Sequence, residues 1–457
     1  MKKTNAWETL TATKEKAVDK FAKEYMDFLD ASKTERTCAK EIIKQAKENG
    51  FEDLDALVKK GKKLVQGQKV FAVNREKSVA LFVIGKNSLE NGFNLVGSHI
   101  DSPRLDLKQN PLYEDGNMAL LKTHYYGGVK KYQWATIPLA LYGVAFDENG
   151  KKVEISIGDD EKDPVFFIND LLIHLSADQL QKKASEVING EQLNVVVGNK
   201  PAKNVEKEPI KNAILDLLKK KYNLSEKSFL TAEFEIVPAG KAREVGFDRS
   251  MIAAYGHDDR VCAFTSLKAI LDVKKPVQTA CAIFMDKEEV GSQGNTGMES
   301  KFFENCLAEL IALEGGYCEL KLKRAFKNGK VLSADVNCCL DPSFPEATEK
   351  NNTATLGDGV VLTKYTGSRG KGGCSDANAE YLHEVATVFD KNKVVWQTGE
   401  LGKVDQGGGG TIAYILANYG AEVVDCGTPV LSMHAPHELV SKIDVYMTYQ
   451  AYYHFSK

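Results

Sequence analysis

Residues 261–286, VCAFTSLKAILDVKKPVQTACAIFMD, carry the pattern that decides the fold. Residues 261–273 have the composition and apolar spacing of a helix, whereas 279–286 is a short apolar run that indicates a buried strand. The same alternation continues to the end of the chain. Strands that alternate with helices indicate a mostly parallel sheet covered by helices on both faces. We therefore predict an α/β fold.

The elements on either side support this prediction. Residues 6–66 are expected to be largely helical, because apolar residues recur at helical spacing among Lys, Glu and Ala. Short β-rich runs follow at 70–74 and 79–85, and a further strand from 94 enters a loop that Pro103 bounds. Beyond residue 286, helices are expected at 302–316, 376–389, 411–420 and 440–455, and strands at 331–337, 394–398 and 422–427.

A segment with a different sequence pattern interrupts the alternation of strands and helices. Residues 125–146 and 151–158 read as hairpin-type strands, 210–223 as a helix, and 229–240 as a strand of alternating pattern. The alternation of strands and helices resumes only after this segment, which indicates an inserted domain. The predicted division is a main domain formed by 1–107 and 244–457, with a β-rich domain inserted at 108–243.

Bulk properties exclude several classes of function. The 457 residues carry a formal net charge of -3, with 43% hydrophobic and 27% charged residues, so no basic footprint suggests nucleic acid binding. No apolar run approaches the roughly 18–20 residues of a membrane span, and the N-terminal residues show no signal peptide. The nine cysteines show no CxxC spacing. We expect reduced thiols and a cytoplasmic protein that binds neither nucleic acid nor membrane.

Polar residues of types that can bind metals or take part in catalysis follow the apolar strands at the points where those strands end. They are His99, Asp101, Asp258, Asp259, Glu288, Glu289, Asp335, His434 and His437. Each alone has an ordinary explanation, such as a helix cap or a surface charge. In open α/β sheets, however, ligands bind at the carboxyl ends of strands, so their joint occurrence predicts one site.

Histidine and carboxylate side chains are typical ligands of a catalytic zinc site, whereas structural zinc is usually held by cysteines. Five or six such groups exceed the three protein ligands of a mononuclear catalytic zinc, which suggests two ions. A carboxylate between two metals about 3.5–4 Å apart would hold a bridging water as the nucleophile. The pair Asp258-Asp259 suits that position. Asp101 could orient the imidazole of His99 from behind.

Five segments carry a resemblance to a known family. GSHIDSPRL, YGHDDRVCAFTSL, MDKEEVGSQG, SADVN and LSMHAPHEL, in this order, resemble the M18 metalloaminopeptidases, the aspartyl-aminopeptidase-like enzymes of the co-catalytic zinc peptidase clan. The resemblance covers nearly the whole chain, including the insert. It implies a hydrolase that removes N-terminal residues, Asp or Glu among them, from short peptides. It also implies two zinc ions per subunit, for which Co²⁺ or Mn²⁺ could substitute.

The resemblance also implies roles for the residues at the strand ends. Metal binding falls to His99, Asp258, Glu289, Asp335 and His434. Asp258 would bridge both ions, Glu289 and His434 would complete one set, and Asp335 the other.

Two further carboxylates have catalytic roles by resemblance. Glu288 would be the general base, and Asp101 the partner of His99. In an extended chain the adjacent Glu288 and Glu289 would point in opposite directions, so that one pair could serve two tasks. The peptide bond after the bridging Asp is often cis in relatives. Asp259 remains the alternative bridging residue.

Substrate contacts and assembly follow from the same resemblance. The inserted domain mediates dimers that assemble into a tetrahedral dodecamer, and a histidine of the insert, here His174, reaches a neighbour's active site. Lys364, with Lys371 nearby, matches the lysine that meets an acidic substrate side chain. Cys338 stands where the family has a histidine, which weakens the expected acidic preference.

The glycine run at 407–410 is expected to allow close backbone approach near the active site, with a helix starting at Thr411. It lacks the GK[ST] ending of a P-loop. Two alternatives to an aminopeptidase stay open from the sequence. One is a dinuclear-metal deacylase or amidase, and the other is a catalytically silent assembly protein of the same fold.

Overall fold

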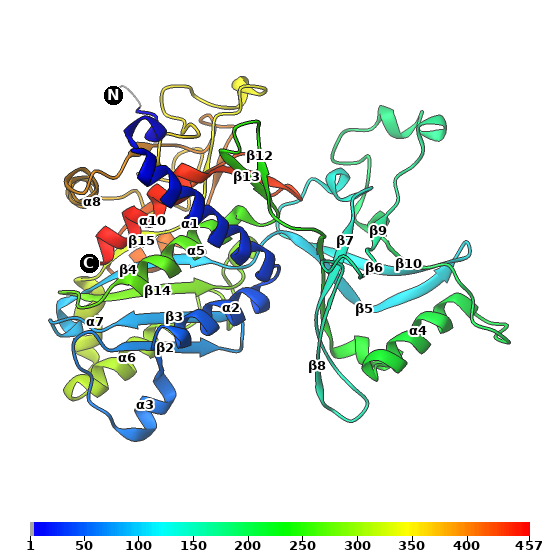
Figure 1. Ribbon diagram of the computed structural model, residues 1–457, viewed down its shortest axis with the longest axis horizontal. Helices are drawn as coiled ribbons and strands as arrows, with labels where there is room; N and C mark the ends of the chain where they lie inside the picture. The colour runs from blue at the N-terminus through cyan, green and yellow to red at the C-terminus, as the bar shows by residue number, and fades with distance from the viewer. Residues whose placement is uncertain (1–3) are drawn as a thin grey trace. The chain divides into compact units, whose positions relative to one another are not determined.

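The computed structural model describes residues 4–457, which form two compact units (Figure 1). One unit contains the chain up to Asp101 together with Ala242–Met433 and Glu438–Lys457. The other contains Ser102–Lys241 and His434–His437. The division into domains at 1–107, 108–243 and 244–457 stays a prediction.

A mixed sheet forms the centre of the first unit. Within residues 4–457 it has nine strands in the order β1-β2-β3-β14-β4-β15-β21-β17-β19. Their bounds are β1 (Glu52–Asp53), β2 (Lys69–Asn74), β3 (Ser78–Val83), β14 (Thr279–Met285), β4 (Phe93–His99), β15 (Lys330–Ser333), β21 (Glu422–Gly427), β17 (Val360–Thr363) and β19 (Trp396–Thr398). The central strands β14, β4, β15 and β21 are all parallel to their neighbours within this group, which confirms the predicted α/β class.

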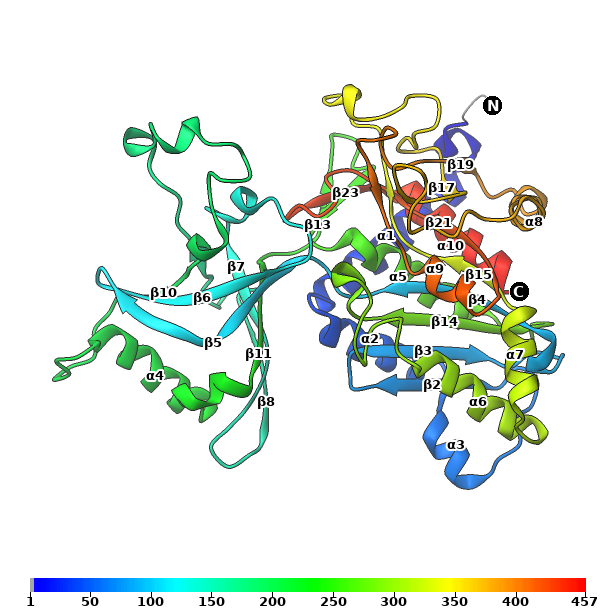
Figure 2. The same ribbon diagram turned by 180° about the vertical axis from the view of Figure 1, so that it is seen from behind.

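Helices cover both faces of this sheet, as Figures 1 and 2 show. They are α1 (Ala12–Ala31), α2 (Glu35–Glu48), α3 (Leu54–Lys60), α5 (His257–Asp272), α6 (Phe302–Gly315), α7 (Glu319–Lys327), α8 (Ala379–Lys391), α9 (Ala413–Asn418) and α10 (Lys442–Ser456). Successive strand residues point to opposite faces, so that Leu95 and Val96 of β4 lie in two different hydrophobic cores. This two-sided burial explains why the central strands are apolar runs without alternation.

The N-terminal 60 residues are mostly helical, as expected, with one exception. Gly50, at φ +81°, follows α2, and Glu52–Asp53 then form the edge strand β1 beside β2. The Asp53 carboxylate accepts a hydrogen bond from the Ala56 N–H at 3.0 Å and so caps α3.

Three small sheets complete the described part of the first unit. β12 (Arg243–Val245), β13 (Met251–Ala254) and β23 (Glu438–Ser441) form one small sheet. β16 (Asn337–Cys338) pairs with β22 (Pro429–Val430), and β18 (Gly367–Ser368) pairs with β20 (Gly408–Gly409). Within residues 4–457, none of the helices has the length and apolarity that crossing a membrane requires.

The second unit is β-rich, as the insert was expected to be. Its described part contains an antiparallel sheet of seven strands in the order β8-β7-β11-β5-β6-β10-β9. The elements are β5 (Arg104–Asp115), β6 (Met118–Tyr126), β7 (Leu139–Phe146), β8 (Lys152–Ile157), β9 (Phe167–Ile168), β10 (Val195–Gly198), α4 (Pro209–Tyr222) and β11 (Glu233–Pro238).

Candidate metal centre

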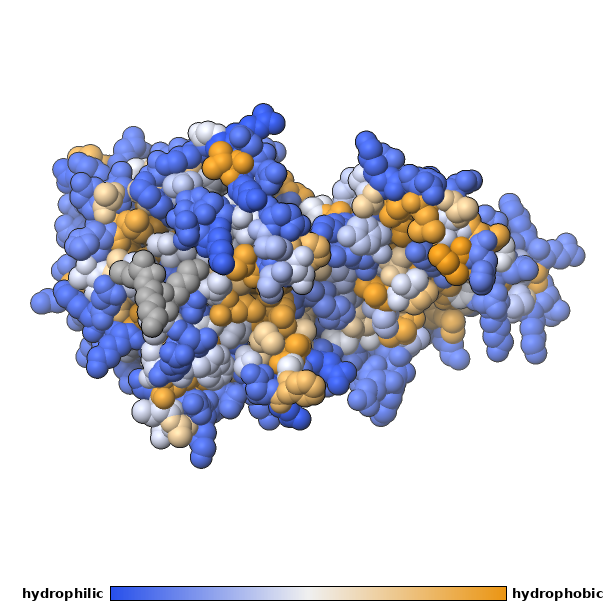
Figure 3. All heavy atoms as spheres, turned by 90° about the horizontal axis from the view of Figure 1, so that it is seen from above, coloured by the Kyte–Doolittle hydropathy of each residue, from blue (hydrophilic) through white to orange (hydrophobic). Residues whose placement is uncertain are grey.

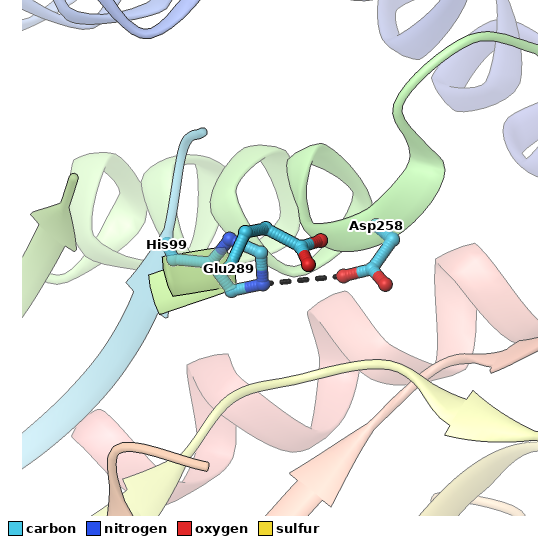
Figure 4. A group of neighbouring side chains, drawn as sticks. All are labelled: His99, Asp258 and Glu289. Carbon is cyan, nitrogen blue, oxygen red and sulfur yellow. Dashed lines mark ion pairs between the residues drawn. The ribbon is translucent and has the colours of Figure 1, made fainter. Parts of the chain in front are cut away.

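The site begins at His99, the last residue of the central strand β4. Its imidazole is 2% exposed, and its Nε2 atom lies 3.1 Å from Oδ1 of Asp258, which comes from the first turn of α5 (Figure 4). The neighbouring parallel strands end at the same edge of the sheet. Met285 of β14 lies opposite His99, and Ser333 of β15 opposite Gly97. The residues that follow these two strands therefore lie close to the imidazole of His99.

Two groups of donor atoms result, and they share His99. One group is His99, Asp258 and Glu289, and the other is His99, Glu288 and Asp335. Each group offers ligand atoms that all lie within 4.8 Å of one another. Nε2 of His99 is 3.7 Å from Asp335 Oδ1 and 4.0 Å from Glu288 Oε2. Six predicted site residues, Asp101 included, therefore converge in one place.

Asp101 links His99 to the paired glutamates. The Nδ1 atom of His99 lies 3.0 Å from the Asp101 carbonyl oxygen and 3.3 Å from Asp101 Oδ1. The Asp101 carboxylate also accepts the backbone N–H groups of Glu288, at 3.1 Å, and Glu289, at 3.2 Å. These glutamates lie in a 3₁₀ turn, Glu288–Val290, rather than in the extended chain that we expected. A carboxylate at the start of that turn satisfies N–H groups that the turn itself leaves without partners.

The two adjacent aspartates have different surroundings. The Asp258–Asp259 peptide bond is cis, as the resemblance implied. Asp258 faces His99 Nε2, whereas Asp259 is fully buried and its Oδ2 accepts the backbone N–H of His99 at 3.3 Å. Of the two, only Asp258 belongs to a donor group among the described residues. This arrangement favours Asp258 as the bridging candidate.

Burial and mutual repulsion make the carboxyl groups weak acids. Burial raises the pKa of Glu288 to about 8, with Asp335, Asp101 and Asp258 adding to the rise and His99 opposing it. Burial likewise raises the pKa of Asp335, and Asp258 adds to it. For His99, burial alone would lower the pKa, but hydrogen bonds to the surrounding aspartates outweigh it and raise the pKa well above 6.5. One imidazole cannot neutralise this many carboxylates, so the donor set fits bound divalent cations.

Comparison with known proteins agrees with this geometry. The family described as aminopeptidase I zinc metalloprotease (M18) matches residues 28–456. The chain belongs to the M18 family. It is 53% identical to a probable M18 family aminopeptidase 1 of Clostridium acetobutylicum over 98% of this chain and 97% of that one.

Solved M18 structures share the fold. The crystal structure of an M18 aminopeptidase from Thermotoga maritima has a TM-score of 0.95 at 44% identity, covering 100% of this chain and 99% of that one. The aminopeptidase I of Clostridium acetobutylicum has a TM-score of 0.93 at 50% identity, covering 99% of both chains. The mApe1 dodecamer of S. cerevisiae, at 20% identity and a TM-score of 0.76, covers 95% of each chain and shows the likeness in fold alone. The chain is thus a zinc metalloprotease of the aminopeptidase type.

Besides Asp101, three predicted site residues of this M18 aminopeptidase lie outside the two donor groups found among the described residues. His434 belongs to the second unit, with its Nδ1 atom 2.9 Å from the Gly128 carbonyl oxygen. His174 lies in the 3₁₀ turn Ile173–Leu175 of the same unit. Lys364 follows β17 and pairs with Asp376 at 2.5 Å, as Lys371 does at 3.0 Å. Their roles as zinc ligand and substrate contacts stay predictions.

Two buried carboxylates near the site escaped the sequence analysis. Asp425 of β21 accepts a hydrogen bond from Thr411 Oγ1 at 2.7 Å, and its pKa is raised to about 7, chiefly by burial. Glu438 accepts the backbone N–H of Asp258 at 3.0 Å. Asp425 offered a signal, because it interrupts the apolar strand 422–427, whereas Glu438 looked like one more polar residue after the histidines.

The glycine run departs from expectation in detail. The helix begins at Ala413, two residues later than predicted, because Thr411 Oγ1 accepts the Ala413 N–H at 3.2 Å and caps the turn. The close backbone approach is present, but its partner is another loop. A Cβ at Gly408 would lie 2.2 Å from the Gly367 carbonyl oxygen.

Proposed function

We propose that this M18 chain is a dizinc aminopeptidase. The observation that supports two ions is that more carboxylates converge around His99 than the three protein ligands of a single catalytic zinc require. The ligands would be His99, Asp258, Glu289, Asp335 and His434. Co²⁺ and Mn²⁺ also accept such ligands and could replace Zn²⁺.

Zinc bound by these side chains would polarise the scissile carbonyl and make water a stronger nucleophile. Glu288 acts as the general base, which takes the proton of the attacking water and delivers it to the leaving amine. Asp101 holds the Glu288 backbone and orients the His99 ring, so it fixes the base and a ligand together. The family assignment favours this mechanism over a deacylase or a silent assembly protein.

The proposed substrates are short peptides, with acidic N-terminal residues as the candidate preference. Lys364 would bind the acidic side chain by a charge-assisted hydrogen bond. Asp376 forms ion pairs with both Lys364 and Lys371, so a substrate carboxylate would have to displace Asp376 from Lys364. Cys338, which is half-buried, supplies no positive charge at the position where the family has a histidine.

Self-association into dimers and a tetrahedral dodecamer is proposed for the second unit. The dodecamer of the S. cerevisiae relative supports this idea. His174 lies among exposed apolar side chains, namely Leu171, Leu172, Ile173 and Leu175, and Figure 3 shows hydrophobic atoms on this unit's surface. Such a patch is typical of a protein contact, and it would carry His174 to a neighbour's active site. A cytoplasmic location agrees with free cysteines throughout the described chain.

A substrate panel tests the proposal. Zinc-loaded protein is assayed with Asp-, Glu-, Lys-, Leu- and Ala-anilides and with their N-acetylated forms. We expect free-amine substrates to be cleaved and N-acetylated ones to be inert. Turnover of N-acetyl amino acids alone would favour the deacylase instead. A profile in which neutral residues are preferred would remove the acidic role of Lys364, and Lys364→Ala would then leave the profile unchanged.

A further inference from the structure

Glu438 contacts the candidate metal centre through the main chain of one proposed ligand, Asp258. It is 2% exposed and begins β23, opposite Ala254 of β13. Its Oε2 atom accepts a hydrogen bond from the backbone N–H of Asp258 at 3.0 Å. Among the described residues, Glu438 belongs to neither donor group. Its hydrogen bond is made to the backbone of the segment that carries a ligand.

The Asp258 N–H needs an acceptor from elsewhere in the fold. It lies at the start of α5, where Asp258 has the non-helical angles φ -82° and ψ 106°, so its N–H is not part of a regular helical turn. The residue before the helix, which usually supplies a capping side chain, is Gly256, at φ +76° and without a side chain. Glu438 supplies the missing acceptor from the neighbouring strand. Its negative charge is also favourable at a helix N-terminus.

The residue before Asp258 is held equally firmly. His257 is fully buried, its Nδ1 atom lies 2.6 Å from the Tyr25 hydroxyl, and its Nε2 atom lies 3.0 Å from the Ile252 carbonyl oxygen. Ile252 belongs to β13, the strand that pairs with β23. The small β13–β23 ladder therefore holds the chain on both sides of the Asp258 amide.

The same kind of contact recurs at the other ligand segments. Asp259 accepts the N–H of His99, and Asp101 accepts those of Glu288 and Glu289. A carboxylate from another segment thus holds the backbone at His99, at Asp258 and at the Glu288–Glu289 turn. The segment after β15, which carries Asp335, is the exception. Glu438 closes this set for Asp258.

We propose that Glu438 is a positioning residue, which sets the place of the Asp258 carboxylate by accepting its backbone N–H and thereby sets the zinc affinity. The proposal rests on the metal ligands named under the proposed function. Glu438 would act on the ligand through the backbone of Asp258.

Two conservative variants of the full chain distinguish the effect of the position of the Glu438 oxygen from the effect of its negative charge. Glu438→Gln keeps an oxygen at the same distance without the charge, whereas Glu438→Asp keeps the charge but withdraws the oxygen by one methylene. Zinc dissociation constants are measured with a competing chelator, and the visible absorption spectrum of Co²⁺-loaded protein reports ligand geometry. We expect Glu438→Asp to weaken zinc binding about 10–100-fold, as loss of an outer contact does, and to alter the spectrum. Glu438→Gln should remain close to the wild type.

Asp444→Asn is the matched control. Asp444 is also fully buried and accepts two backbone N–H groups, from Gly357 at 2.7 Å and Gly359 at 2.8 Å, but it belongs to neither donor group among the described residues. This variant should lose thermal stability without losing zinc affinity.

The reverse order, with Glu438→Gln weakened and Glu438→Asp unchanged, would overturn the proposal in favour of a purely electrostatic role. Unchanged zinc affinity in both variants would overturn it as well. If Glu438→Asp does not fold, Glu438→Ala takes its place: weakened zinc binding there, with Glu438→Gln near the wild type, supports the positional role, and unchanged zinc binding overturns it. Wild-type protein that binds no zinc would instead refute the proposed function.

Discussion

Glu288 experiences two opposing electrostatic influences. Burial and neighbouring carboxylates raise its pKa to about 8, whereas a bound dication would lower the pKa towards the working range of a general base. As the proposed base, Glu288 would therefore have a high proton affinity before zinc binds, and the charge of bound ions would reduce it.

Glu288→Gln tests that role at the level of the single residue. The substitution keeps the shape of the side chain but removes the proton acceptor, so the rate of anilide hydrolysis should fall by about 10²–10⁴-fold. The peptide N–H that Asp101 accepts remains, so the turn should keep its place. Zinc content is measured beside the rate. Turnover equal to that of the wild type would remove Glu288 from the mechanism.

At the scale of elements, the β18–β20 pair joins two loops by glycine contacts. Gly408 has φ +135°, and a Cβ there would also lie 2.6 Å from the Ser368 Cα atom. Gly408→Ala should therefore separate the strands. Because Arg369 and Lys371 lie in the loop after β18, we expect trypsin to cut there faster than in the wild type.

Gly410→Ala is the control for this experiment. Its nearest neighbour would be the Gly373 carbonyl oxygen at 3.9 Å, an ordinary contact, so its digestion pattern should match the wild type. Equal cleavage rates for Gly408→Ala and the wild type would show that the pair does not hold the loops.

The elements also show what the sequence could predict. Helix and strand periodicity predicted β14 and α5, and the polar residues at strand ends predicted that His99, Asp258 and Glu289 meet, because parallel strands end at one edge. The roles of Glu438 and Asp259 could not be predicted in this way. Both act by accepting backbone N–H groups of distant segments, and such contacts leave no pattern of spacing in the sequence.

At the scale of the whole molecule, the acid cluster couples stability to pH and zinc. Glu288, Asp335 and Asp425 have raised pKa values in the folded protein, so between their ordinary pKa and the folded value the folded state holds more protons than the unfolded state. The raised pKa of His99 acts in the same direction. Stability of the metal-free protein should therefore fall as the pH rises from about 5 to about 8.

Zinc should reverse much of this loss. Because the ions bind the deprotonated ligands, the rise in melting temperature on adding zinc should be larger near pH 8 than near pH 5.5. Thermal unfolding with and without chelator, at about these two pH values, measures the effect. Asp444→Asn should retain the zinc-dependent part, since Asp444 belongs to neither donor group among the described residues. A zinc shift of equal size at both pH values would contradict a carboxylate-dominated site.

The central claim is that the side chains gathered around His99 hold two zinc ions. Elemental analysis of protein dialysed against zinc, and then against metal-free buffer, tests it most directly. We predict two zinc ions per chain for the wild type and the loss of at least one in His99→Ala, because this imidazole is a proposed ligand of one ion. A single zinc ion per chain in the wild type, or two that persist in His99→Ala, would contradict the account.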